Sequence, residues 1–346
     1  MIDTDNRIQS FAANRTISVA RSAITTVNLG VNALKSVSTL KPGALFNETI
    51  KTLANGKQIS AGKADTRIKI LRFVTNSAET SETIVSDETA AIPAYAVWNA
   101  EAREMVIYTA ADKVMAHANS SDTFLYMQAL TSLDLKTFDT ANATSMNQMF
   151  RECYSLPSLD VSTFNTEKVT DMNNMFNYCM GLRSLDVSGF NTANVTNMSG
   201  MFAWCWRITS LDLKSFNTEK VTDMNFMFLK CEGLPKLDVS TFNTANVTNM
   251  DSMFDYCESL TSLDLSMFNT EKVKNMYFMF GDCYNLTSLN LGTSFTMDLV
   301  SNTDEMCYNM ASVSGACTVS CTEETENKMK ASRGFPTSGI SFVRPQ

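Results

Sequence analysis

The cysteines of this 346-residue chain follow one another with a regularity that strongly limits the possible folds. Six of the nine cysteines are separated by steps of 26 residues, and leucine, phenylalanine and methionine positions keep the same step. The six are Cys153, Cys179, Cys205, Cys231, Cys257 and Cys283. A fixed period between about 20 and 50 residues is typical of one supersecondary unit stacked many times. The repeat therefore predicts a solenoid, an architecture that more often binds than catalyses.

A single unit, from Cys153 to Cys179, predicts the path of one turn. The segment 158–162 alternates polar and apolar residues, which indicates a short strand with Leu159 and Val161 inward. The Met-Phe-x-x-Cys segment that ends the unit has the spacing of one helical turn. We therefore expect a short β-strand plus a short helical turn in each 26-residue repeat.

The cysteine and methionine columns are expected to lie in the core. Neighbouring turns of such a stack are about 5 Å apart, so side chains at one repeat position lie above one another. The cysteines are then either buried free thiols or disulfides, and we favour free thiols. Methionines such as Met172 and Met175 are interpreted as core filler rather than as soft-metal ligands. We expect neither a metal nor a cofactor.

Polar columns accompany the apolar ones. An aspartate between two inward-facing residues of each strand is expected to face outward, balanced by serine and backbone donors; a cation site or an acidic track for a basic ligand is the alternative. The asparagine after each phenylalanine, such as Asn165, is expected to bond the backbone of the adjacent turn. Glu-Lys and Ala-Asn pairs alternate between turns, which makes the full unit 52 residues long. The acidic column consists of Asp134, Asp160, Asp186, Asp212, Asp238 and Asp264.

The order of motifs from Phe190 to Leu213 resembles a known family. Phe-Asn-Thr is followed by Val-Thr-x-Met, Met-Phe-x-x-Cys and Leu-Asp-Leu. This order is similar to that of the BspA-like leucine-rich-repeat surface proteins of bacteria, over about residues 105–345. The resemblance implies a solenoid of leucine-rich-repeat type and a role in adhesion and surface recognition.

Four regions are predicted along the chain. They are an N-terminal anchor or oligomerisation segment (1–40), a small β-rich capping region (41–120), the leucine-rich-repeat solenoid (121–310) and a C-terminal cap (311–346). Apolar residues in the first region are spaced as in a heptad seam, which favours a coiled coil of three strands; a strand or extended arm is the alternative. The seam consists of Ile17, Ala20, Ile24, Val27, Val31 and Leu34.

The capping region is expected to contain two hairpins. Asn55-Gly56 predicts a type I′ turn between Ile50 and Ile59, and residues 68–74 read as a strand. Residues 94–98 and 105–109 predict a second hairpin, which we expect to cover the open end of the solenoid.

Charge and motifs exclude several classes of function. The net charge is −8 without a Lys/Arg cluster, which argues against nucleic acid as a partner. The sequence lacks a run of 18 apolar residues and begins without a basic and apolar leader, so we expect neither membrane insertion nor a secretory signal. The single histidine, His117, belongs to no recognisable catalytic motif. We therefore expect a protein that is not an enzyme.

Variation between repeats points to a binding site near the Met-Phe-x-x-Cys segment, where aromatic residues gather. Aromatic side chains are favoured at recognition hot spots, although several of these could instead cover core edges. We predict a fibre or adhesin on a virion or bacterial cell surface, anchored by its N-terminus to a virion or surface protein. Its solenoid would bind a host surface protein or carbohydrate; the alternative is a structural spacer without a specific ligand. The candidate binding residues are Tyr154, Tyr178, Trp204, Trp206, Phe226, Tyr256, Tyr277, Phe278 and Tyr284.

Overall fold

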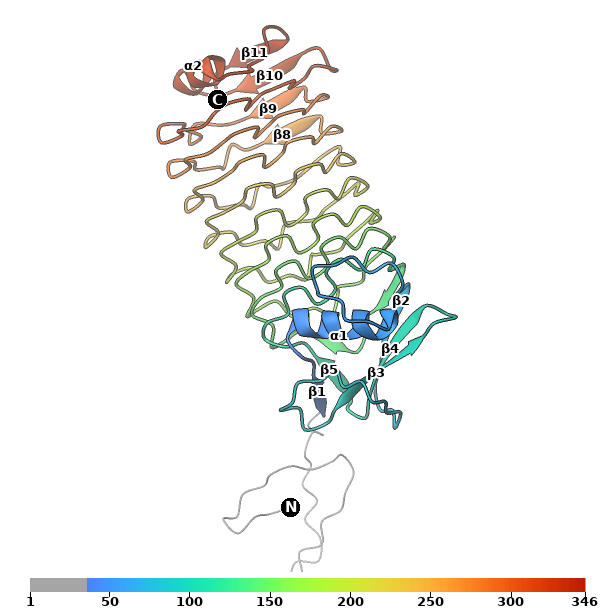
Figure 1. Ribbon diagram of the computed structural model, residues 1–346. Coiled ribbons are helices and arrows are strands. Elements are labelled where there is room, and N and C mark those ends of the chain that lie inside the picture. The colour runs from blue at the N-terminus through green and yellow to red at the C-terminus, as the bar shows by residue number, and fades with distance from the viewer. Residues whose placement is uncertain (1–35, 346) are drawn as a thin grey trace, which may run out of the picture.

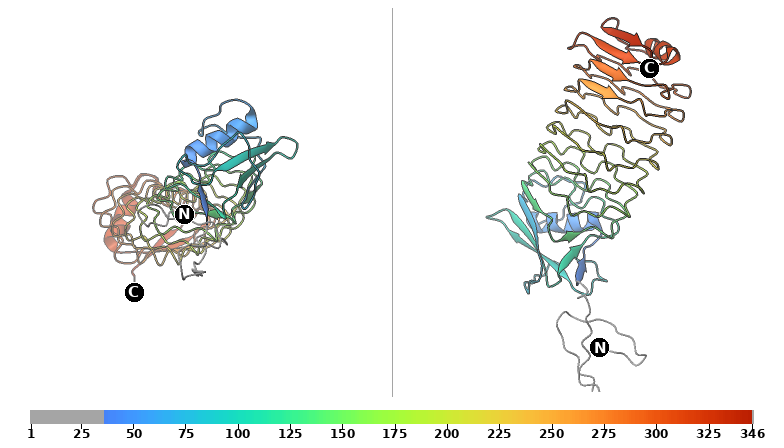
Figure 2. Two further views of the ribbon diagram at one scale, coloured as in Figure 1. Left: turned by 90° about the horizontal axis from the view of Figure 1, so that it is seen from below. Right: turned by 180° about the vertical axis from the view of Figure 1, so that it is seen from behind.

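The computed structural model describes residues 36–345, which form an elongated stack of turns with a cap at each end (Figure 1). Between the caps the chain repeats one path from turn to turn. The first described residues and the C-terminus lie at opposite ends of the stack (Figure 2).

Backbone contacts join each turn to the next at a constant offset in sequence. Parallel bridges pair Ser145 with Asp171 and Asp171 with Asn197, and they continue at steps of 26 residues as far as Asn275. The last step, from Asn275 to Asn302, is one residue longer. The ladder confirms the 26-residue repeat, and the extra residue marks the start of the C-terminal cap.

Short parallel strands line one side of the stack. The strand β6 (Ser132–Asp134) lies at its N-terminal end. At the C-terminal end, β8 (Ser262–Asp264), β9 (Ser288–Asn290), β10 (Cys317–Ser320) and β11 (Ile340–Val343) form one parallel sheet in that order. Leu263 pairs with Leu289 in register, so equivalent leucines meet on the core side of the sheet.

The predicted strand at 68–74 and the predicted hairpin at 94–109 are both present. The strand β2 (Ile70–Val74) pairs in parallel with β6 on one side and with β4 (Glu104–Thr109) on the other. The edge strand β3 (Ala94–Asn99) pairs antiparallel with β4. The hairpin thus extends the strand side of the stack and ends it with an antiparallel edge.

A second small sheet supports the same cap. The strand β5 (Lys113–Met115) lies between β1 (Val37–Thr39) and β7 (Phe138–Asp139), and both pairings are parallel. This sheet connects the first described residues to the first turns of the stack.

The Met-Phe-x-x-Cys segment is not helical, contrary to the sequence prediction. In the turn that ends at Cys179, the N–H groups of Met175, Asn177 and Cys179 donate three residues back, as in successive β-turns. The alternate N–H groups donate to the next turn, for example from Phe176 to the carbonyl oxygen of Met201 (3.0 Å). Positive φ at Tyr178 (61°) interrupts any helical path. In a helix every amide would bond a carbonyl group of the same segment, so none would remain to join neighbouring turns of the stack.

Threonine, and not the preceding asparagine, bonds the adjacent turn. Asn165 uses its Oδ1 within its own turn, where it accepts the N–H of Glu167 (3.0 Å). Thr166 donates from Oγ1 to the carbonyl oxygen of Asn191 (2.9 Å) and accepts the N–H of the same residue (2.8 Å). The expected role of the asparagine column therefore belongs to the threonine column. An asparagine side chain readily forms a local Asx-turn, which competes with longer-range bonding.

The alternating Glu-Lys and Ala-Asn pairs form contacts between unlike turns. Lys220 Nζ donates to Asn194 Oδ1 (2.7 Å), and Asn194 Nδ2 donates to the carbonyl oxygen of Glu167 (2.8 Å). The same pattern joins Lys272 to Asn246 (2.7 Å). The 52-residue unit is therefore present as a contact pattern as well as in the sequence.

The core is built from columns of identical residues. Successive rings of Phe150, Phe176 and Phe202 stack with centroids 5.6 and 5.9 Å apart. All nine cysteines are buried free thiols. Each thiol of the repeat column donates to a phenylalanine carbonyl oxygen of the preceding turn, as Cys205 does to Phe176 (3.2 Å).

A helix, α1 (Gly43–Asn55), occupies the place where the sequence predicted a hairpin from 50 to 59. Gly56 has a φ of 65° and donates its N–H to the carbonyl oxygen of Thr52 (3.0 Å), so it ends the helix instead of forming a hairpin turn. A glycine with left-handed backbone can end a helix or form a type I′ turn, which explains why the prediction of a hairpin was wrong. The apolar side chains on the buried face of α1 are Phe46, Ile50 and Ala54.

Two polar side chains of α1 end the backbone ladder at the first turn. In the rest of the stack, the carbonyl groups of a turn accept amides of the preceding turn. Within residues 36–345 the first turn has no preceding turn, so side chains of α1 supply the donors instead. Asn47 Nδ2 donates to the carbonyl oxygens of Thr123 and Leu125, both at 3.1 Å. Lys51 Nζ donates to Leu125 (2.6 Å) and to two carbonyl oxygens of the loop after α1 (2.8 and 2.9 Å). Burial lowers the pKa of Lys51 to about 8.

The C-terminal cap adds β10, β11 and the helix α2 (Glu323–Ala331). Thr322 caps α2 by accepting the N–H of Thr325 (3.2 Å). After α2, Arg333 offers its carbonyl oxygen to the N–H of Glu305 (2.8 Å), which satisfies an amide of the last turn.

Candidate recognition site

The residues next to each cysteine form two columns at the edge of the stack. The cysteine points into the core, and its neighbours are half-buried, except for the buried Asp282 before Cys283. Tyr178, Trp204 and Tyr256, which precede their cysteines, have φ values of 61°, 62° and 56°. This left-handed backbone allows the cysteine and its neighbour to diverge in these turns, the cysteine inward and the aromatic residue outward.

Aromatic rings from successive turns meet along these columns. Tyr154 and Tyr178 have centroids 6.2 Å apart, and Tyr178 stacks on Trp204 at 4.7 Å with an interplanar angle of 11°. Trp206 lies 6.5 Å from Trp204, and its indole Nε1 donates to the carbonyl oxygen of Met180 (3.2 Å). The rings thus form one surface rather than isolated side chains.

A lysine continues this surface where the aromatic column is interrupted. Lys230 Nζ lies 4.7 Å from the centroid of Trp204 and 3.5 Å from that of Tyr256. Tyr256 in turn lies 6.4 Å from Tyr284. Sequence reasoning missed Lys230, although it occupies the repeat position of Trp204 one turn later. We define the aromatic strip as Tyr154, Tyr178, Trp204, Trp206, Lys230, Tyr256 and Tyr284.

Polar groups flank the N-terminal end of the strip. The hydroxyl of Tyr154 donates to Glu152 Oε2 (2.6 Å), which also accepts from Gln128 Nε2 (3.0 Å). Burial and the bond to Glu152 raise the pKa of Tyr154. The guanidinium of Arg151 lies 5.9 Å from the ring centroid of Tyr126 in the first turn. The strip therefore begins beside the N-terminal cap.

Two buried carboxyl groups, those of Asp255 and Asp282, adjoin the C-terminal end of the aromatic strip. Asp282 accepts from Asn309 Nδ2 (2.8 Å), and burial together with interaction with Asp282 raises the pKa of Tyr256 and Tyr284. Asp255, 8% exposed, has an Oδ1 that makes no hydrogen bond among the described residues. Burial and the nearby Asp282 raise the pKa of Asp255 to about 8, so this carboxyl group holds its proton at neutral pH.

Three predicted aromatic residues lie apart from the strip. Tyr277, 36% exposed, contacts Phe278 edge to face at 4.6 Å, and Phe278 contacts Tyr308 at 5.8 Å. Phe226 occupies the repeat position of Phe278 two turns earlier and is half-buried. Sequence reasoning also missed Tyr308, which the 27-residue last step places at the repeat position of Gly281 and Asp255.

The acidic column lies on the exposed side of the strands. Asp160 Oδ1 accepts the N–H (3.0 Å) and the hydroxyl (2.6 Å) of Ser162, and these bonds lower the pKa of Asp160. Asp186 and Asp238 are held in the same way by the serine two residues on. The expected serine and backbone donors are therefore present. Over residues 36–345, no group of three His, Cys, Asp or Glu side chains is placed to hold a metal ion.

The remaining predicted residues contribute no further site. His117 Nδ1 accepts the N–H of Asn119 (3.0 Å) at the first turn. The proposed oligomerisation residues, from Ile17 to Leu34, lie outside the described residues. In the described part of the chain, no helix has both the length and the apolar character needed to cross a membrane.

Comparison with known proteins identifies a family for the repeats. The family described as "Mycoplasma protein of unknown function, DUF285" matches twice in tandem, over residues 118–232 and 204–319, and so covers more than half of the chain. No curated protein and no solved structure matches the chain. The protein is therefore a member of the DUF285 family, with its repeat region formed by family units.

Proposed function

We propose that this protein is a non-enzymatic recognition protein, displayed on a virion or a bacterial cell surface, and that its aromatic strip binds a host surface protein or glycan. The observation that carries the proposal is the continuous contact from Tyr154 to Trp206 and through Lys230 to Tyr284. Half-buried aromatic rings that are already packed lose little side-chain entropy when a partner covers them.

The fold supports this proposal. A stack of leucine-rich-repeat type, similar to the BspA-like surface proteins, provides a long rigid support for a linear binding surface. Residues 1–40 serve in this proposal as the anchor to a virion or surface protein and as the trimerisation segment. Light scattering of the full chain should give a trimer, and a chain that begins at residue 36, which retains β1, should give a monomer.

The central experiment removes both indoles of the strip. We expect a chain with Trp204→Ala and Trp206→Ala to lose at least ten-fold in binding to host cells or to a glycan array. Trp98→Ala is the matched control, because it removes an indole from β3, outside the strip, and should leave binding unchanged. Thermal unfolding of both variants separates lost contacts from lost structure. Undiminished binding by a folded double variant would rule out the strip as the recognition surface.

A further inference from the structure

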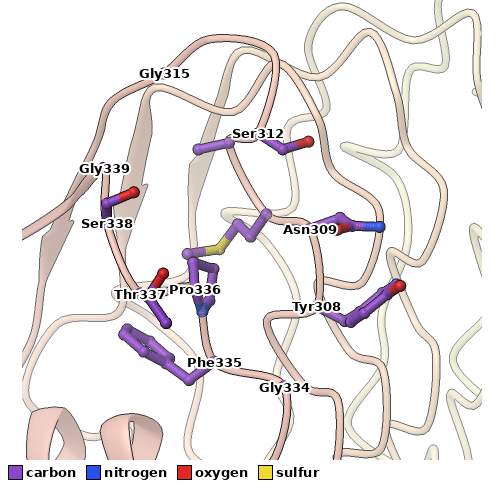
Figure 3. A pocket seen from close by; sticks show the side chains of 12 residues that line it. Tyr308, Asn309, Ser312, Gly315, Gly334, Phe335, Pro336, Thr337, Ser338 and Gly339 are labelled. Atoms are coloured by element: carbon purple, nitrogen blue, oxygen red, sulfur yellow. The ribbon is translucent and has the colours of Figure 1, made fainter.

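A hollow of about 380 Å³ lies in the C-terminal cap, where the last turn faces the loop after α2. Figure 3 shows Tyr308 and Asn309 of the last turn on one side and Phe335, Pro336 and Thr337 of the loop on the other. Its volume falls within the range of about 300–1,000 Å³ that is typical of small-molecule sites.

The walls of the hollow are fixed by contacts outside it. Phe335 stacks on Phe342 with centroids 6.1 Å apart. Arg333 Nε pairs with Glu305 Oε1 (3.1 Å), which ties the loop to the last turn. Gly334 has a φ of 77°, and a side chain there would collide with the Glu305 carboxylate. The cavity is therefore formed before a ligand arrives, which reduces the ordering entropy of binding.

The lining is neutral, partly aromatic and rich in hydroxyl groups. It contains no Lys, Arg, His, Asp or Glu side chain. Tyr308 is 41% exposed and presents an aromatic face, while Ser312, Thr337 and Ser338 supply hydroxyls. Ser312, Thr337 and Ser338 are exposed, and among residues 36–345 their hydroxyls have no hydrogen-bond partner in the protein.

The orientation of Asn309 adds an acceptor to this set. Its Nδ2 donates to Asp282 Oδ1 (2.8 Å), and this bond orients the amide. Figure 3 shows the amide nitrogen turned away from the loop. The Oδ1 of Asn309 is thus available to a ligand hydroxyl.

We propose that this hollow binds a neutral hexose at the end of a glycan. The apolar C–H face of a pyranose stacks on an aromatic ring such as Tyr308, and its hydroxyls pair with amides and hydroxyls such as Asn309 and Ser338. An anionic sugar would find no cation in the lining, and an apolar peptide side chain would leave the hydroxyls unused. The ring contacts from Tyr308 through Phe278 to Tyr277 continue the aromatic surface beyond the hollow, where the next sugar would lie. This inference rests on the proposed recognition function and names its ligand class.

A printed array of oligosaccharides that end in neutral hexoses, with counterparts that carry terminal sialic acid, tests the inference on the full chain. We expect the neutral glycans to bind at least ten-fold more tightly than their sialylated counterparts. Titration with the strongest array glycan should show at least a ten-fold loss for Tyr308→Ala and complete loss for Ser338→Trp, which fills the hollow. Tyr108→Ala, in β4, is the control and should bind as the unmodified chain does.

Three results would overturn the inference: no neutral glycan bound by the folded chain, equal or tighter binding of the sialylated series, or undiminished binding by a folded Ser338→Trp variant. The strip is tested separately. If the double tryptophan variant loses cell binding while both variants of the hollow retain it, the hexose site is wrong and the proposed function stands. If the hollow binds hexose while the double tryptophan variant still binds cells, the hexose site stands and the strip is wrong.

Discussion

The thiol of Cys179 donates a hydrogen bond to the carbonyl oxygen of Phe150, 3.1 Å away in the preceding turn. The cysteine column therefore joins successive turns through the core as well as filling it. Burial raises the pKa of the thiols, to about 12 for Cys153 and Cys205. Since the thiolate is the reactive form, these cysteines should be inert in the folded protein.

Thiol titration with Ellman's reagent at pH 8 tests this expectation. The folded protein should show almost no reaction over minutes, because all nine cysteines are buried, and nine thiols should react after unfolding in guanidinium. Fewer than nine after unfolding would indicate disulfides, and rapid reaction of the folded chain would contradict the buried column.

The threonine column should contribute strongly to stability. Thr192, 1% exposed, both donates to and accepts from the backbone of Asn217, at 2.9 and 2.8 Å. Thr192→Val leaves that N–H and carbonyl unpaired and should lower the free energy of unfolding by about 2–4 kcal/mol. Urea denaturation measures the loss. The exposed Thr196 donates to the carbonyl of Thr170 (3.1 Å), and Thr196→Val should cost less than about 0.5 kcal/mol. Equal losses would show that the buried bonds have no special role.

Asp255 should make stability fall as pH rises. Its pKa is about 8 in the folded chain against an ordinary 3.8, so the folded state holds a proton that the unfolded state releases between these values. The stabilisation is complete below about pH 4 and is lost as pH rises through 8. Asp255→Asn, which copies Asn177 at the same repeat position, removes this dependence. Each unit of the pKa difference is worth about 1.4 kcal/mol, so the variant should exceed the unmodified chain in stability by several kcal/mol at pH 9.

Unfolding in urea at pH 5, 7 and 9 measures this effect. Asp238→Asn is the control. The bonds from Ser240 lower the pKa of Asp238, so the stability that this group contributes is lost as pH falls below about 4. Between pH 5 and 9 this variant and the unmodified chain should therefore show the same pH dependence. A parallel pH dependence of Asp255→Asn and the unmodified chain would contradict the assignment.

Lys51 should be essential for the N-terminal cap. Lys51→Met removes the donor from three carbonyl groups, one in the first turn and two in the loop after α1, and should destabilise the protein by about 2–5 kcal/mol. Hydrogen exchange should show the largest loss of protection in α1 and the first turn. Lys57→Met, on the exposed part of the same loop, should leave exchange unchanged. Normal protection of α1 in Lys51→Met would show that the lysine does not hold the cap.

The sequence predicted the repeat well, because a stacked fold places equivalent residues in equivalent environments. The buried leucine, phenylalanine and cysteine columns follow directly from the 26-residue step. It did not predict the path of the Met-Phe-x-x-Cys segment. Apolar spacing there fits a helical turn, but bonding between turns requires alternate amides to point along the stack, as that of Phe176 does.

The caps were harder to predict because their residues occur once. Asn47 and Lys51 are polar residues on the buried face of α1, which weakens the apolar pattern of the helix. Their partners in the first turn, the carbonyl groups of Thr123 and Leu125, are more than 70 residues away, and local sequence contains no trace of them. Lys230 was missed for a different reason: its repeat position is evident from the 26-residue step, but a lysine does not stand out among aromatic residues until its Nζ is seen to pack on the rings of Trp204 and Tyr256.

The contacts of Lys220 with Asn194 and of Lys272 with Asn246 set the increment by which this protein can change its reach during evolution. Gain or loss of a single turn would place two like pairs side by side. Gain or loss of two turns preserves every such contact and both ends of the molecule, while it alters the length by about 10 Å. Unequal recombination between the near-identical gene segments would thus produce longer and shorter homologues in steps of 52 codons.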